Sequence, residues 1–401
     1  MDFELTDEQG MLRDTVRELL ARHYDPETRL KTLDTELGWS REVWAQLAEL
    51  GVLGLSFAEE DGGVGAGPVE TMVVMEEFGR RLAPEPLLDA VLLPGGLIAE
   101  AGTAAQRRRV LPEVAAGEKL LAFAHAELGS RWPATELTTG AIADGDGYRI
   151  TGLKNPVPHG DCADLLVVSA ALPDGTAGLF LVAADAAART PYRTFDGLRG
   201  AQLEFDGAAA ELLGEPGDVS GAIADRITAA QASLCAESVG AMGEALRLTT
   251  EYLKTRKQFG VTLSKFQTLT QRAASMYVSL ELARSMSLYA TASLADGDPD
   301  PNGDGESAGR VSNGDGRSAE LAEPAGRVST VASRARLQAS RSGRHIGQEA
   351  IQMHGGIGVT AEYPVSHYVA RLTAIERTFG GAFEHLRVLT ERVGEYGLVE
   401  L

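Results

Sequence analysis

One carboxylate stands alone in an apolar stretch of the sequence. Between Arg226 and Glu244, Glu237 is the only charged residue. A lone carboxylate in such surroundings is expected to be buried, and burial raises a carboxyl pKa toward neutrality, where the group can act as a general base. The alternative is a structural role, in which Glu237 forms a hydrogen bond to Ser233 or to a neighbouring helix. Glu237 is therefore the candidate catalytic residue.

Two other segments contain groups that could bind an anion. Arg256 supplies a cation in the sequence Thr-Arg-Lys-Gln-Phe-Gly at 255–260, and Gly355 and Gly356 form a turn whose backbone N–H groups can approach an anion closely. The alternatives are simpler, because Arg256 could end a solvated helix and the two glycines could cap another helix. The residues alone leave both interpretations open.

These residues must be positioned by elements of different kinds, which follow one another along the chain. Residues 1–120 show helical periodicity, 121–216 contain short runs typical of strands, and 217–401 return to long alanine-rich helices. We therefore predict an α+β protein with an N-terminal helical domain, a central small β-barrel or sandwich of antiparallel strands, and a C-terminal domain like a four-helix bundle. Glycine, aspartate, serine and proline are frequent in 296–326, which we expect to be a flexible insertion between two helices.

Composition disfavours several classes of partner. The 401 residues include 37 Lys plus Arg against 57 Asp plus Glu, and this formal net charge of -20 disfavours nucleic acid or an anionic membrane surface. No run of about 18 apolar residues is present, so we expect no membrane insertion. Two cysteines, Cys162 and Cys235, give neither a disulfide framework nor a zinc ligand set. The histidines show no metal-ligand spacing, so we predict a cytoplasmic protein without a bound metal.

Three pairs of motifs, in this order and at this spacing, resemble the acyl-CoA dehydrogenases. They are Leu-Ala-Glu-Leu-Gly at 47–51 with Glu-Asp-Gly-Gly at 60–63, the motif at 255–260 with Phe-Gln at 266–267, and Gln-Met-His-Gly-Gly-Ile-Gly-Val-Thr at 352–360 with Glu-Tyr-Pro at 362–364. The resemblance covers essentially the whole chain apart from 296–326. It implies a flavoprotein with FAD as cofactor. The implied reaction is α,β-dehydrogenation of an acyl-CoA thioester to the 2-enoyl-CoA, in which a carboxylate removes the α proton.

The resemblance also implies which residues hold the cofactor. In proteins of this family, the FAD of a neighbouring subunit is contacted by residues that match Arg256, Phe259, Gln267, Gln352, Gly355 and Gly356. Such contacts require an oligomer, usually a dimer of dimers, and the family implies an electron-transfer flavoprotein as the redox partner. FAD contains the pyrophosphate that the arginine and the glycine turn would bind.

The sequence departs from the family where the catalytic base is expected. One group of members places a glutamate shortly after the Glu-Tyr-Pro motif, where this chain has Phe379, and a second group places it on the preceding long helix, where this chain has Ala230. Neither side chain can accept a proton. Glu237 lies two helical turns, about 10 Å, beyond Ala230. Gly240 and Gly243 beside it would leave room for a bulky acyl group.

The segments that wrap the flavin ring in this family are also altered. The family's Thr-Glu-Pro-Gly-x-Gly-Ser and Trp-Ile-Thr stretches correspond here to 125–131 and to Pro-Val-Pro-His at 156–159. The two prolines remove backbone donors, and no hydroxyl stands where the threonine of the second stretch should be. Ser130 is the best surviving match to a cofactor contact.

Two functions therefore remain open. The first is FAD-dependent dehydrogenation of an acyl-CoA by this chain, alone or as one chain of a heteromer such as the α2β2 complexes of some actinobacterial members. The alternative is a non-catalytic partner subunit that completes the FAD site of another acyl-CoA dehydrogenase chain. A redox-silent acyl-CoA-binding protein on the same fold is a third possibility. The residues for a neighbour's FAD are intact while those for the chain's own flavin and base are altered, which fits both of the first two functions.

Overall fold

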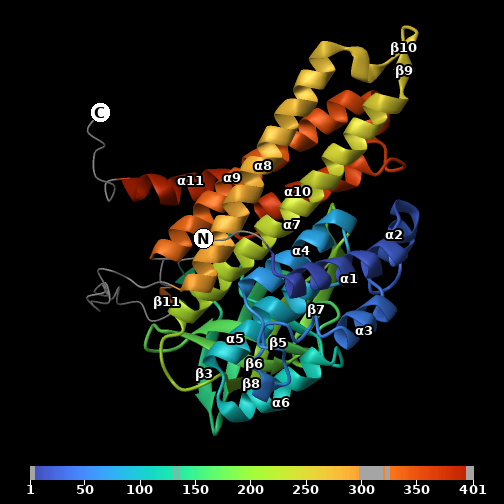
Figure 1. The fold of residues 1–401 in the computed structure, drawn as a ribbon. Coiled ribbons are helices and arrows are strands. Elements are labelled where there is room, and N and C mark those ends of the chain that lie inside the picture. Colours follow the sequence, from blue (N-terminus) through green and yellow to red (C-terminus); the bar gives the residue numbers. More distant parts are fainter. Residues whose placement is uncertain (1–4, 131, 133–135, 298–318, 321–325, 394–401) are drawn as a thin grey trace.

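The first part of the chain is helical in the computed structural model, which describes residues 5–130, 132, 136–297, 319–320 and 326–393 (Figure 1). Thr6, Asp25, Ser40 and Thr103 each accept a hydrogen bond from a first-turn N–H group, which fixes the start of the helix that follows. A π-helical segment, Leu88–Leu92, runs directly into α5. The helices are α1 (Asp7–His23), α2 (Pro26–Leu33), α3 (Arg41–Glu49), α4 (Pro68–Arg81), α5 (Leu93–Ala101) and α6 (Ala104–Ala115).

The middle of the chain forms a small barrel. Strands pair in the order β1-β5-β3-β4-β8-β6, and a further pairing of β6 with β5 closes the ring. Most pairs are antiparallel as predicted, but β1 and β3 pair with β5 in parallel, so the all-antiparallel prediction was wrong there. The long connections that separate β5 from β1 and β3 in sequence permit parallel pairing. The strands are β1 (Leu121–Ala124), β2 (Glu136–Leu137), β3 (Gly140–Asp144), β4 (Gly147–Pro158), β5 (Leu165–Ala171), β6 (Ala177–Ala183), β7 (Ala188–Arg193) and β8 (Arg199–Leu212).

The last part returns to helices, and four of them pack as a bundle. These are α7 (Ser220–Thr255), α8 (Gln267–Asp296), α9 (Arg327–His354) and α10 (Val365–Arg377), followed by α11 (Ala382–Glu391). A short hairpin of β9 (Lys257–Gln258) and β10 (Val261–Thr262) joins α7 to α8. Most of the predicted insertion 296–326 lies outside the described residues, apart from β11 (Ala319–Glu320), which pairs with β2.

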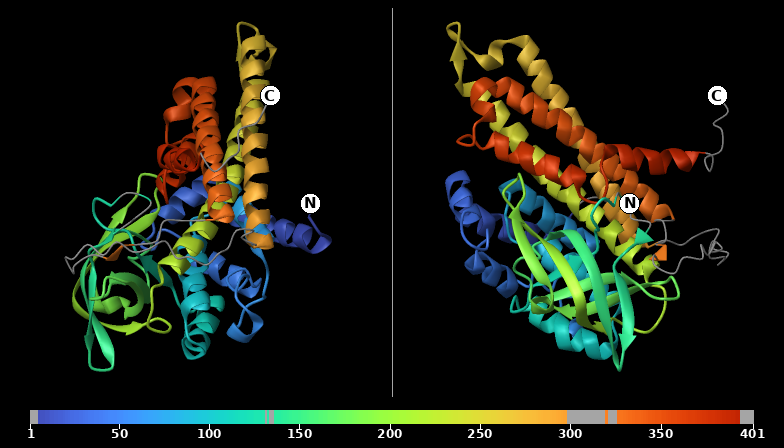
Figure 2. Two further views of the ribbon diagram at one scale, coloured as in Figure 1. Left: turned by 90° about the vertical axis from the view of Figure 1, so that its left-hand side faces the viewer. Right: turned by 180° about the vertical axis from the view of Figure 1, so that it is seen from behind.

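The barrel and the N-terminal helices lie together at one end of the bundle, and the β9–β10 hairpin lies at the other end (Figure 2). A single hydrophobic core joins the three parts, because Val74 on α4, Val167 on β5 and Leu234 on α7 belong to one buried cluster. The barrel has a second cluster of its own around Phe180 and Phe205. Elements from all three parts are therefore held rigidly around their junction.

Two glycines let α4 and α7 approach each other closely. A Cβ atom on Gly240 of α7 would lie 1.9 Å from the backbone oxygen of Glu76, and one on Gly79 of α4 would lie 1.9 Å from the backbone oxygen of Glu237. Only glycine fits at such a crossing. The α4 backbone therefore covers α7 beside Glu237.

Candidate functional site

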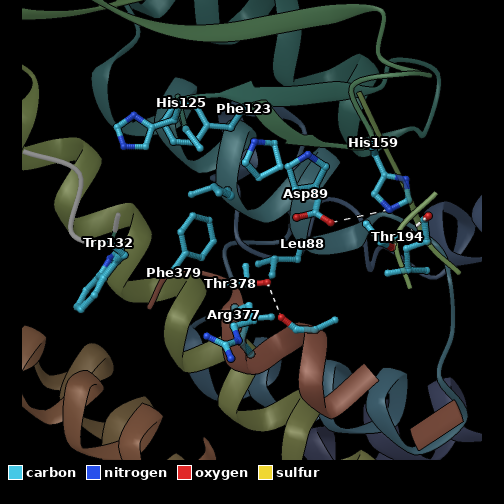
Figure 3. Close-up of a pocket in the computed structure, with 18 of the residues that line it drawn as sticks. Leu88, Asp89, Phe123, His125, Trp132, His159, Thr194, Arg377, Thr378 and Phe379 are labelled. Carbon is cyan, nitrogen blue, oxygen red and sulfur yellow. Dashed lines mark hydrogen bonds and ion pairs between the residues drawn. The ribbon is translucent and has the colours of Figure 1, made fainter. Parts of the chain in front are cut away.

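A cavity of about 500 Å³ lies where the barrel, the π-helical segment, α7 and the end of α10 meet (Figure 3). Most of its wall is apolar, and a few polar groups interrupt it, which is the usual form of a small-molecule site. The wall includes Asp89, Phe123, His125, His159, Arg371 and Phe379.

Both segments that correspond to flavin-ring contacts lie on this wall, 125–130 from one side and 156–159 from another. Ser130, the predicted cofactor contact, is also on the wall. Its hydroxyl donates a hydrogen bond to the backbone oxygen of Glu127 at 2.7 Å and accepts one from the Glu127 N–H at 3.2 Å. The Ser130 side chain thus closes its own turn, and its contact with a cofactor stays a prediction.

A buried ion pair supports the first of these segments. Lys154 is fully buried, and its ammonium donates hydrogen bonds to Glu127 Oε1 at 2.8 Å and to the backbone oxygen of His125 at 3.1 Å. Burial alone would raise the pKa of Glu127, but the charge and hydrogen bond of Lys154 and the donors of Thr138 and Thr139 lower it to about 2. Burial lowers the pKa of Lys154 to about 8. Both groups are charged at neutral pH. Their ion pair, together with the bond to His125, holds this segment of the cavity wall in place.

Asp89 and His159 lie next to each other on the cavity wall, and Asp89 Oδ2 is 3.9 Å from His159 Nε2 (Figure 3). Burial raises the pKa of Asp89 to about 6 and lowers that of His159 to about 4. The sequence analysis placed His159 in an altered flavin-ring segment without a role of its own, and it missed Asp89. Asp89 is the only charged residue between Pro86 and Ala99, so the criterion that selected Glu237 would also have found it.

The two family positions for a catalytic base contain no proton acceptor in this chain. Phe379 reaches the cavity wall, and its backbone oxygen accepts a hydrogen bond from Gln231 Nε2 at 3.0 Å. Ala230 is buried on α7 and lies on the wall of a second cavity of about 260 Å³. The two cavities are adjacent, because Leu88 and Leu93 line both.

The predicted base, Glu237, is buried as expected, and its carboxylate is held by an arginine of another helix. Arg371 on α10 donates to Glu237 Oε1 from Nε at 2.5 Å and to Oε2 from Nη2 at 2.9 Å. The same guanidinium donates to Asp196 Oδ2 from Nη1 at 3.0 Å. This arrangement favours the structural alternative, in which Glu237 bonds to a neighbouring helix, and Glu237 as the base stays a prediction.

The prediction that Gly240 leaves room for a bulky acyl group was wrong. The α4 backbone already occupies the space beside this glycine, as the 1.9 Å approach to Glu76 shows. Gly243, one turn further along α7, has nothing within 4 Å of its Cβ position.

The residues predicted to contact a neighbour's FAD gather at the far end of the bundle. Arg256 ends α7, and Gly355 begins the turn after α9. These two helix ends are joined by Tyr252, whose ring centroid lies 4.5 Å from that of His354. The predicted set lies in the segments around these two helix ends, at the end of the bundle that carries the β9–β10 hairpin (Figure 1): Arg256, Phe259, Gln267, Gln352, Gly355 and Gly356.

This face of the chain is open to solvent. Phe259 is 91% exposed, and the side chains of Arg256, Gln267 and Gln352 are exposed as well. Gly355 has a φ of +64°, and neither Gly355 nor Gly356 has an atom within 4 Å of its Cβ position. Arg256, which has no ion pair among the described residues, and an uncovered glycine turn at the same end of the bundle fit the pyrophosphate of FAD, which needs charge and close backbone N–H groups.

Comparison with known families agrees with this arrangement. Residues 6–118 match the acyl-CoA dehydrogenase N-terminal domain, and residues 221–312 and 316–393 match the acyl-CoA dehydrogenase C-terminal domain. The chain belongs to the acyl-CoA dehydrogenase family. The predicted fold class, FAD as cofactor and the oxidoreductase class are thereby confirmed. As an acyl-CoA dehydrogenase, the chain serves the FAD-dependent oxidation of an acyl-CoA thioester, alone or as one chain of a heteromer.

Several relatives resemble this acyl-CoA dehydrogenase over nearly their whole length. Acyl-CoA dehydrogenase FadE27 of Mycobacterium tuberculosis is 28% identical over 401 residues, which cover 98% of this chain and 99% of FadE27. Acyl-CoA dehydrogenase IpdE2 of the same organism is 30% identical, with 97% and 98% covered.

Solved structures agree with the fold over the same span. A chain of the ChsE4–ChsE5 complex from Mycobacterium tuberculosis has a TM-score of 0.84 and 27% identity, with 99% of this chain and 100% of that chain covered. A chain of a Tcur3481–Tcur3483 steroid acyl-CoA dehydrogenase variant has a TM-score of 0.83 and 30% identity, with 97% and 98% covered. Among the described residues, no helix combines the length and the hydropathy that a membrane span requires.

Proposed function

We propose that this acyl-CoA dehydrogenase chain works in a heteromer, where it completes the FAD site of a partner chain that supplies the catalytic base. The observation that carries the proposal is a contrast between two sets of residues. Glu237 is bound by Arg371 through two hydrogen bonds, whereas Arg256, Phe259 and the glycine turn are exposed to solvent. Glu237 and Arg371 stabilise the fold of this chain, whereas the exposed residues are available to a neighbouring subunit.

The chain's own residues would act on the cofactor by binding and positioning it. The chemistry that bound FAD would supply is acceptance of the β hydrogen of the acyl-CoA as hydride. Arg256 would neutralise the pyrophosphate, and the N–H groups of Gly355 and Gly356 would donate to its oxygens. Phe259 would cover the cofactor with an apolar ring that is otherwise in water. None of these groups removes a proton, so the α proton must leave to a carboxylate of the partner chain.

Two relatives support a heteromer, because both the ChsE4–ChsE5 complex and the Tcur3481–Tcur3483 enzyme are named for two different chains. We infer a dimer of dimers in the cytoplasm, with an electron-transfer flavoprotein as oxidant of the reduced flavin. The competing function is a self-sufficient enzyme with Glu237 as its base. In that case Arg371 would have to release the Glu237 carboxylate before each proton transfer.

The visible absorption spectrum separates these functions. The chain should be purified alone, and then co-expressed with the acyl-CoA dehydrogenase chains encoded beside it. The proposal predicts a colourless isolated chain and a yellow complex that is bleached by an acyl-CoA. A flavin spectrum of the isolated chain, bleached by an acyl-CoA without any partner, would contradict it.

A further inference from the structure

The turn after β4 brings together three side chains of the types that bind zinc. In the sequence His-Gly-Asp-Cys at 159–162, a ring nitrogen of His159, a carboxylate oxygen of Asp161 and the sulfur of Cys162 all lie within 4.8 Å of one another. Nitrogen, oxygen and sulfur donors in one cluster are typical zinc ligands. His159 belongs to the cavity wall, whereas Asp161 and Cys162 do not line the cavity, and the site does not depend on the proposed heteromer.

Two polar atoms of this cluster are buried without a hydrogen-bond partner among the described residues. They are His159 Nδ1 and Asp161 Oδ1, and the His159 side chain is only 3% exposed. Buried polar atoms in native proteins are usually paired, so two unpaired atoms in one short turn indicate a missing partner. A bound cation would satisfy both atoms at once.

The second ring nitrogen of His159 is already directed elsewhere. His159 Nε2 faces the Asp89 carboxylate at 3.9 Å, on the cavity side of the ring (Figure 3). Nδ1 is therefore the nitrogen available to a metal. A carboxylate hydrogen-bonded to the distal nitrogen orients metal-bound histidines, so the 3.9 Å gap to Asp89 would have to close when the ion binds.

The turn itself is held in place from outside. Arg189 Nη1 donates to the backbone oxygens of Asp161 at 3.2 Å and Ala163 at 3.1 Å, and its Nε donates to Ala184 at 2.9 Å. The Cys162 N–H donates to the backbone oxygen of His159 at 3.3 Å. These bonds fix the backbone so that the three side chains converge without any ion present.

We propose that His159, Asp161 and Cys162 form a zinc site behind the cavity wall, with Asp89 positioning the imidazole. The Cys162 thiol, which donates to the backbone oxygen of His159 at 3.5 Å without the ion, would release its proton to solvent as zinc binds. Zinc bonds of about 2.0–2.3 Å place ligand atoms about 3.5 Å apart, so the three atoms must close by about 1 Å when the ion enters. Three protein ligands leave a fourth position for water. The ion would lock residues 156–159, which line the cavity. A mixed set of histidine, aspartate and cysteine shows neither the histidine spacing nor the cysteine pairs from which a metal site is usually predicted, so the sequence did not indicate it.

Cobalt(II) is the probe for this site, because a cobalt–thiolate bond gives an intense near-ultraviolet charge-transfer band. Full-length chain without an affinity tag should be treated with a chelator and titrated with Co²⁺ and then with Zn²⁺. We expect one equivalent of Co²⁺, a thiolate band, and loss of the band as Zn²⁺ displaces it. The variant Cys235→Ser removes the other cysteine, which is buried on α7, and should behave like the wild type.

Two variants and one protection experiment decide the outcome. Cys162→Ser should lose the band, and Asp89→Asn should weaken binding about 10–100-fold if it positions His159. A wild-type chain without the band, or the same band in Cys162→Ser, overturns the proposal. If Cys162→Ser fails to fold, alkylation of wild-type Cys162 gives the answer. Zinc should slow that alkylation at least 10-fold, and an unchanged rate would overturn the site.

Discussion

Arg371 on α10 donates two hydrogen bonds to the carboxylate of Glu237 on α7, at 2.5 and 2.9 Å, although 134 residues separate them. Both side chains are largely removed from solvent, and Asp196 supplies a second carboxylate to the same guanidinium at 3.0 Å. A buried charge without its partner is strongly destabilising. The pair therefore ties α7, α10 and the loop before β8 together beneath the cavity.

Replacing Glu237 by Gln tests whether this carboxylate is structural or catalytic. We expect a loss of about 3 kcal/mol in the free energy of unfolding, near the lower end for a broken buried pair because Asp196 still faces Arg371. Turnover of the assembled complex should be nearly unchanged. Glu251→Gln breaks an exposed pair with Arg247 on the same helix and should cost less than about 1 kcal/mol. A fall in kcat of about 10²–10⁴-fold would instead identify Glu237 as a general base.

Because α4 and α7 cross closely at Gly240 but not at Gly243, alanine substitutions at these two positions should change the free energy of unfolding in opposite directions. Gly240→Ala places a methyl group 1.9 Å from the Glu76 backbone oxygen, so the helices must separate. We expect a loss of at least about 3 kcal/mol in unfolding free energy. Gly243→Ala meets nothing within 4 Å and should stabilise the helix by about 0.5–1 kcal/mol. Denaturant unfolding measures both, and equal effects would show that the helices do not cross this closely.

The Lys154–Glu127 pair predicts how stability depends on acid. The native pKa of Glu127 is about 2, below its ordinary value of 4.5, so the unfolded state binds the proton first. This contribution to stability is present above pH 4.5 and is lost as the pH falls toward 2. Lys154→Met should cost about 3–5 kcal/mol at pH 7, because it leaves Glu127 charged and buried.

The double variant Glu127→Gln with Lys154→Met is the control for this pair. It removes both charges, so it should recover part of the lost stability and flatten the fall between pH 4.5 and 2. Unfolding free energies across that range measure both effects. An acid dependence that is the same in the wild type and the double variant would contradict the role of Glu127.

The sequence showed which side chains occupy the candidate site, but it did not show which residues those side chains contact. The absence of a base at positions 230 and 379 can be read directly, and the burial of Glu237 follows from its apolar neighbours. The ion pair between Glu237 and Arg371 cannot be predicted from the sequence in this way, because it depends on how α10 packs against α7. The space beside Gly240 was misjudged for the same reason, since the occupying backbone comes from α4.

The sequence was sufficient to predict whether each part of the chain is helical or made of strands, and in which order these parts follow one another. Helical periodicity and strand alternation are local properties, so the three parts of the chain follow from the sequence. Parallel pairing of β1 with β5 depends on long-range register and could not be read from the strands themselves. The Lys154–Glu127 network was missed because its members come from separate segments that the barrel brings together.

The claim that this chain completes a partner's FAD site is tested most directly by Arg256→Ala within the co-expressed complex. Lys254→Ala, an exposed lysine two residues earlier on α7, is the matched control. Loss of one charge-assisted contact of about 1.5–3 kcal/mol should weaken FAD binding about 10–100-fold, while the complex still assembles. The measurement is the dissociation constant of FAD, by flavin fluorescence during refilling of the deflavinated complex. Equal affinities in Arg256→Ala, Lys254→Ala and the wild type would contradict the account.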